Sequence, residues 1–124
     1  MEDVRKIVQR ALDAVFFGAV EVLPETVERE MMPDEYITHS VVSGGYTDYA
    51  NGRPIRRRDY VDVTWCGISI ADKGPRAEQI IAAMVAANFD VINTGTDLTR
   101  TDASDYYGVT MEFALSRMVT QSGA

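Results

Sequence analysis

The sequence predicts an α+β domain in which two helices pack on one face of a mostly antiparallel β-sheet, with a projecting β-hairpin. Apolar residues recur at helical spacing near the N-terminus and again between residues 75 and 88. Strand-like segments lie between and after these two helices, and an Asn51-Gly52 pair separates the two longest of them. Because the order is helix, strands, helix, strands, placing both helices on one sheet face is the economical arrangement.

Length and composition describe an ordinary globular chain. The 124 residues, 46% hydrophobic and 25% charged, fit one domain spanning 1–124, with a tail at 119–124 that we expect to fray. No apolar run approaches the roughly 20 residues of a membrane span, and the charged N-terminus does not resemble a signal peptide. A net charge of −7 argues against a general nucleic-acid binder.

The first half of the chain predicts one helix and a long hairpin. Residues 2–17 form an amphipathic helix, and Gly18 follows it as a candidate left-handed cap. Residues 19–23 are a short strand and 36–42 a longer one, which 46–50 can continue to the Asn51-Gly52 turn. The return strand runs from about 55 to 70. The apolar stripe of the helix consists of Val4, Ile7, Val8, Ala11, Leu12 and Val15.

The second half predicts a helix and two strands. Asp72 is a candidate N-cap, Pro75 suits the first helical turn, and residues 89–93 form a strand. Residues 94–108 are expected to be a long polar connection, and 109–118 alternate as a half-buried strand. One helix face holds Ala77, Ile80, Ile81, Met84, Val85 and Asn88. The expected core comprises Trp65, Val63, Phe113, Met111, Ile80, Ile81 and Met84.

No set of residues predicts a catalytic, cofactor or metal site. His39 is the only histidine and lies in a strand, where an ordinary structural role is favoured. Cys66 is the only cysteine, which excludes an internal disulfide and a multi-cysteine zinc site. The segment DKGPRAE, which opens the second helix, matches neither a P-loop nor a dinucleotide fingerprint. The loop acids Asp97, Asp102 and Asp105 lack the glycine and terminal glutamate of an EF-hand.

The arginine run at 56–58 is the most unusual local feature. In the return strand Val61 and Trp65 share one face, and extending that face backward brings Asp59 and Arg57 onto it. A monomer core does not accept both charges without compensation, so we expect the core-facing part to begin near Val61. Residues 46–59 would then form a hairpin that runs past the body of the domain.

A projecting hairpin needs something to lie against, because an isolated two-stranded ribbon is marginal in water. Tyrosine and arginine are enriched at protein interfaces, and an acidic subunit offers carboxylates to arginines. We therefore predict a protein-contact arm; a plain solvated hairpin and a nucleic-acid contact are the alternatives. The predicted interface residues are Tyr46, Tyr49, Arg53, Arg56, Arg57 and Arg58.

The chain resembles the tail completion proteins, also called tail terminator or tail-to-head joining proteins, of long-tailed bacteriophages. The resemblance runs in order over about residues 4–117, beginning with the amphipathic helix and GAVEVLPE. DEYITHSVVSG is similar to the family's Pro-Tyr-Ile-x-Tyr strand, although Asp34-Glu35 replaces the usual proline. YANGRPIRRRDYVDVTW is similar to its hairpin and Tyr-x-Val-x-Val strand. AEQIIAAMVAANFDV and YYGVTMEFALSR are similar to its second helix and closing strand.

The resemblance implies a structural virion protein. Such proteins form a ring, commonly a hexamer, at the head-proximal end of the tail, where they end tube growth and join the tail to the head. Implied partners are further copies of the chain, the major tail protein and the head connector, in host cytoplasm during assembly. It implies no enzyme activity, no cofactor and no specific nucleic-acid binding, although DNA passes through the lumen. A small nucleic-acid-binding module and an enzyme with a site between subunits remain the alternatives.

Overall fold

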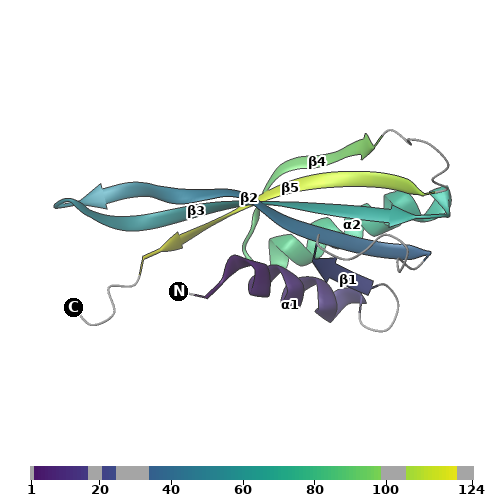
Figure 1. Cartoon of the computed structure of the whole chain (residues 1–124), viewed down its shortest axis with the longest axis horizontal. Coiled ribbons are helices and arrows are strands. Elements are labelled where there is room, and N and C mark those ends of the chain that lie inside the picture. The colour runs from purple at the N-terminus through teal and green to yellow at the C-terminus, as the bar shows by residue number, and fades with distance from the viewer. Residues whose placement is uncertain (1, 17–20, 25–33, 99–105, 120–124) are drawn as a thin grey trace.

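The computed structural model describes residues 2–16, 21–24, 34–98 and 106–119. Two α-helices, one short 3-10 helix and five strands make up these ranges (Figure 1). The helices are α1 (Val4–Phe16), η2 (Ile70–Asp72) and α2 (Lys73–Ala86), and the strands are β1 (Glu21–Pro24), β2 (Glu35–Ala50), β3 (Arg53–Gly67), β4 (Asp90–Leu98) and β5 (Tyr107–Met118).

The strands form one sheet in the order β1-β2-β3-β5-β4. β1 pairs with β2 in parallel, and the other three pairings are antiparallel. Both α-helices lie on the same side of this sheet, and α1 and α2 contact each other there (Figure 1). The predicted α+β class is therefore confirmed. Neither α-helix in the described ranges is long and apolar enough to cross a membrane.

The long β2–β3 hairpin follows from its turn residues and its alternation. Asn51 and Gly52 both adopt positive φ, 53° and 76°, as a two-residue type I′ turn requires. From that turn the two strands stay paired down to Glu35 opposite Gly67, with bulges near Val41, Tyr46 and Asp48. The hairpin predicted from the Asn-Gly pair is thus present.

The core lies between the helices and the covered sheet face. Val4, Val8 and Leu12 of α1 are buried there, as the predicted stripe requires. Of the seven expected core residues, Ile81 is only partly buried, and the other six are 0% exposed: Trp65, Val63, Phe113, Met111, Ile80 and Met84. Trp65 also donates its indole N–H to Glu35 Oε1 at 3.0 Å, so its one polar atom has a partner.

The second half departs from the sequence-based expectation in three places. β4 continues to Leu98, so residues 94–98 are paired strand rather than part of a polar connection. An edge strand with one open face needs few apolar residues, which is why its polar sequence indicated a loop. Asp72 makes no side-chain capping bond at the start of α2, because η2 leads directly into the helix. Val85 was expected on the packed face, but 51% of it is exposed.

Candidate functional site

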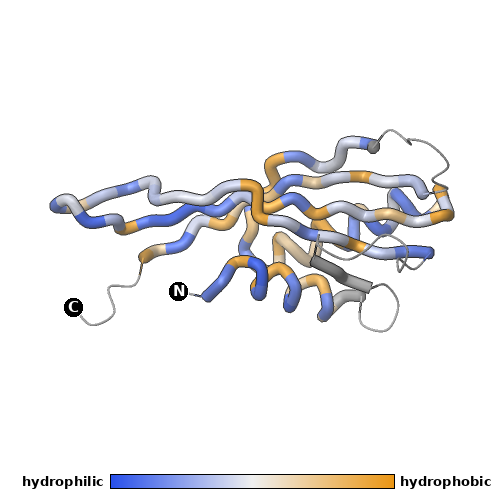
Figure 2. The backbone as a smooth tube through the Cα atoms, in the orientation of Figure 1, coloured by the Kyte–Doolittle hydropathy of each residue, from blue (hydrophilic) through white to orange (hydrophobic). Residues whose placement is uncertain are grey.

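The candidate site is the part of the β2–β3 hairpin that extends past the helices, which we call the arm (residues 46–58). β1 accompanies β2 only as far as His39, and β5 accompanies β3 as far as Arg56, opposite Met118. Beyond that point two strands remain, and they project away from the helices (Figure 1). Figure 2 shows that hydrophilic residues dominate the arm.

The projecting part is shorter than the predicted 46–59, because β5 supports residues 56–59 as a third strand. The Val119 N–H also donates to the Ile55 carbonyl at 2.9 Å, so the tail expected to fray is held at its first residue. Residues 120–124 of that tail lie outside the described residues. The two-stranded tip is residues 49–54, where Tyr49 pairs with Pro54 and Ala50 with Arg53.

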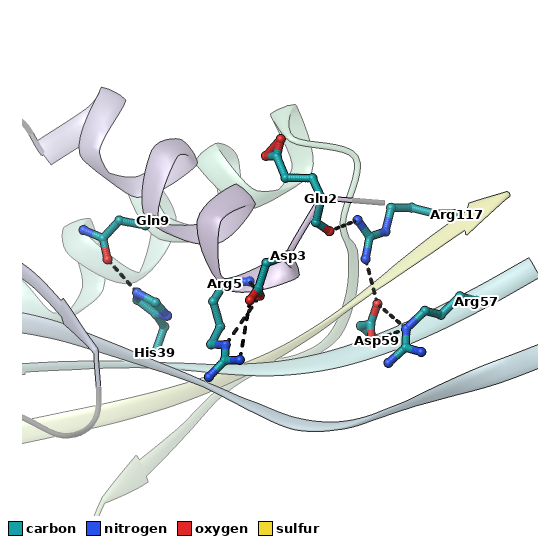
Figure 3. Close-up of polar contacts among 8 residues, drawn as sticks. All are labelled: Glu2, Asp3, Arg5, Gln9, His39, Arg57, Asp59 and Arg117. Carbon is teal, nitrogen blue, oxygen red and sulfur yellow. Dashed lines mark hydrogen bonds and ion pairs between the residues drawn. The ribbon is translucent and has the colours of Figure 1, made fainter. Parts of the chain in front are cut away.

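At the root of the arm, Asp59 is buried as an ion. Its side chain is 2% exposed and receives bonds from two arginines, Arg57 Nε to Oδ1 at 3.0 Å and Arg117 Nη2 to Oδ2 at 3.0 Å (Figure 3). Arg117 also donates to the Glu2 carbonyl at 2.7 Å, which ties β5 to the start of α1. Two cations satisfy the carboxylate, so its desolvation is compensated.

This cluster corrects the expectation that the core-facing part begins near Val61. The covered face accepts Asp59 because Arg57 follows it onto the same face and Arg117 arrives from β5. Gly44 stands opposite Asp59 in the ladder and leaves room for the carboxylate, since a Cβ there would collide with Oδ1. Sequence reasoning found the pair of charges but missed Arg117, whose partner is 58 positions away.

The three arginines of the run have different surroundings. The Arg57 guanidinium lies 5.3 Å from the centre of the Tyr46 ring, and its hydrogen bond with Asp59 raises the pKa of Arg57. Arg58 points to the opposite face, where it donates to Ser116 Oγ at 2.7 Å and pairs with Asp90 at 3.1 Å. The hydrogen bond with Tyr60 raises the pKa of Arg58.

Arg56 is more exposed. Half of its side chain reaches solvent, and its ion pair with Asp48 is long, at 3.5 Å. Tyr49 and Tyr46 are 62% and 48% exposed, and Arg53 is exposed at the tip. The structure therefore divides the six predicted residues. Arg57 and Arg58 hold the root of the arm together, while Tyr46 and Tyr49 present aromatic surface and Arg53 and Arg56 present positive charge.

His39 couples β2 to α1. It is 6% exposed, and its Nε2 donates to Gln9 Oε1 at 2.7 Å (Figure 3). Its Nδ1 is buried without a partner, which fits a neutral ring. Burial lowers the pKa of His39, opposed by the charge of Asp13 and aided by that of Arg5. These contacts describe a structural histidine between a helix and the sheet.

The other residues considered from the sequence do not converge. Cys66 is a free, partly buried thiol on β3, and Asp97 pairs with Lys73 at 2.9 Å. Asp102 and Asp105 lie outside the described residues. Within the described ranges no group of three or more histidine, cysteine or acidic side chains could hold a metal ion.

Comparison with known proteins adds little. No family model and no curated protein matches the chain. One solved structure, of an uncharacterised protein, is similar over 94% of this chain and 96% of its own, with 15% sequence identity and a TM-score of 0.48. A likeness of that size carries no argument about family or function.

Proposed function

We propose that this protein is a structural component of a phage tail, which forms a ring at the head-proximal end, ends tube growth and joins the tail to the head connector. In this role it acts through protein contacts rather than through chemistry. Its partners are further copies of itself, the major tail protein and the connector. The ordered resemblance of its sequence to tail completion proteins supports the proposal.

The observation that carries the proposal is the arm. Its tip contributes no residue to the hydrophobic core, yet it exposes a tyrosine and an arginine, residue types that recur in protein interfaces. A two-stranded ribbon of this length is marginal when it stands alone. The ion cluster of Asp59, Arg57 and Arg117 fixes the direction of the arm, as expected for an element that must meet a partner at a set position.

The test changes the charge of the arm without touching its root. Replacing Arg53 and Arg56 by glutamate leaves the pairs of Arg57 and Arg58 intact, so we expect a folded monomer. Replacing all of 56–58 would instead set a like charge beside buried Asp59. In a phage that depends on this gene, we expect over-length tails or tails without heads under negative-stain electron microscopy. The reason is that like charges across an interface cost several kcal/mol, order of magnitude.

A matched control makes the same change of charge on α1. The side chains of Arg5 and Arg10 are 68% and 67% exposed, so glutamate at both positions should support normal particles. Tails of normal length joined to full heads, with the arm variant shown to be in the particle, would refute the proposal. A salt-dependent gel shift with DNA that the wild type shows and the arm variant lacks would favour the nucleic-acid alternative instead.

A further inference from the structure

The sheet face opposite the helices carries a polar pattern that sequence reasoning did not detect. Register places four threonines in one row across the sheet, and Thr64 Oγ1 lies 3.0 Å from Thr110 Oγ1. The neighbouring row contains Asp62 directly opposite Glu112. The threonine row is Thr38, Thr64, Thr110 and Thr96, and the acidic row is Ser40, Asp62, Glu112 and Asn93.

The acidic row imposes a cost on the isolated chain. Like charges directly opposite on adjacent strands destabilise a sheet, and neither of the flanking residues, Ser40 and Asn93, carries a positive charge. Asp62 and Glu112 are both partly exposed. A positive group brought by a second molecule would offset this repulsion, so the row is suited to meet a basic surface.

The arm of another copy is such a surface. Residues 46–58 hold four arginines and one aspartate, a net charge of +3, which leaves −10 for the rest of a chain whose total is −7. Arm-to-arm contact would bring like charges together, whereas arm-to-sheet contact brings opposite charges together. A contact between two different surfaces of the same chain is heterologous and closes into a ring when the rotation allows.

We propose that the open sheet face of one copy receives the arm of a second copy, with Arg53 and Arg56 placed against Asp62 and Glu112. This inference deepens the proposed function, since it rests on the arm being a contact between subunits of a ring. The tip aromatic Tyr49 would then lie over the threonine row.

The test is a charge exchange followed by sedimentation velocity at low ionic strength over a concentration series. The arm variant carries Arg53→Glu and Arg56→Glu, and the face variant carries Asp62→Arg and Glu112→Arg. We expect wild-type protein to associate and each double variant to associate more than about tenfold less tightly. An equimolar mixture of the two variants should associate again, because each then offers the other a complementary surface. The chain with all four changes should behave like the mixture.

Two further measurements keep the proposal falsifiable. Circular dichroism verifies that each variant is folded, and Glu112→Gln serves where the face variant is not. That neutral change should weaken association while raising the denaturant midpoint of the monomer, since it removes the like-charge pair. Association should fall at about 1 M salt, where the Debye length is about 3 Å.

Wild-type protein that stays monomeric at every concentration overturns this contact, as does a mixture of variants that associates no better than either alone. The proposed function fails separately, when particles made with the arm variant are normal. Association that survives all the charge changes overturns the arm-to-sheet contact and leaves the tail role to its own test.

Discussion

Gly44 and Asp59 show how a single small residue permits a buried charge. The two residues are directly paired across β2 and β3, and a Cβ on Gly44 would meet the carboxylate that Arg57 and Arg117 hold in place. The carboxylate cannot move aside without losing an arginine. Glycine is therefore required at this position by space and not by backbone conformation, since its φ is not in the left-handed region.

We predict that Gly44→Ala lowers the free energy of unfolding by about 1–3 kcal/mol, the usual range for overpacking a filled site. Gly45→Ala is the matched control, because no atom lies within 4 Å of a Cβ built at that neighbouring residue. Urea unfolding of the two variants and the wild type measures the difference. Equal midpoints for the two variants would show that Asp59 is not held where the structure places it.

At the scale of elements, His39 is the polar contact that docks α1 on the sheet. The neutral ring donates to Gln9 from Nε2 and leaves Nδ1 buried. Protonation would add a charge and an N–H that has no acceptor there. Burial lowers the pKa of His39 below the 6.5 of the unfolded chain, so the unfolded state binds the proton more readily.

The contribution of neutral His39 is therefore fully present above pH 6.5 and is lost as the pH falls from there through the lowered pKa. We predict that the urea midpoint of the wild type falls between pH 7.5 and 5.5, while that of His39→Gln changes less over this interval. Carboxylates that titrate near pH 4 affect both proteins alike. Parallel pH profiles would contradict the prediction.

Which elements the sequence could predict depends on how local their signals are. The Asn51-Gly52 turn and the alternation of 109–118 determine a hairpin and a strand from neighbouring residues alone. The polar strand end at 94–98 could not be told from a loop, because its side chains face no helix. Arg117 of the ion cluster, and the threonine and acidic rows, depend on register between distant strands, which no single segment contains.

The candidate site divides in the same way. Residue types and the run of arginines were enough to select the arm. They were not enough to separate Arg57 and Arg58, which bind within the chain, from Arg53 and Arg56, which lie nearer its tip. Strand parity does place Arg57 and Arg58 on opposite faces. Their partners, however, come from other strands: Arg58 meets Asp90 of β4, and Arg117 of β5 shares Asp59 with Arg57.

At the scale of the whole molecule, stability and contact are assigned to different ends. The hydrophobic core lies entirely between the helices and the sheet, and no residue of the tip belongs to it. The tip is also beyond the last pairing with β5 and beyond the ion cluster. Its removal should therefore change assembly far more than folding.

We predict this outcome for a shortened hairpin in which Tyr49, Ala50, Arg53 and Pro54 are deleted, so that Asn51-Gly52 remains as the turn. Thermal unfolding of the monomer should change by no more than about 0.5 kcal/mol, as for surface changes away from special features. Self-association in sedimentation velocity should be lost, because the deletion removes the exposed tyrosine and arginine of the tip. A shortened chain that unfolds at a much lower temperature would show instead that the tip stabilises the fold, and one that still associates would place the contact elsewhere.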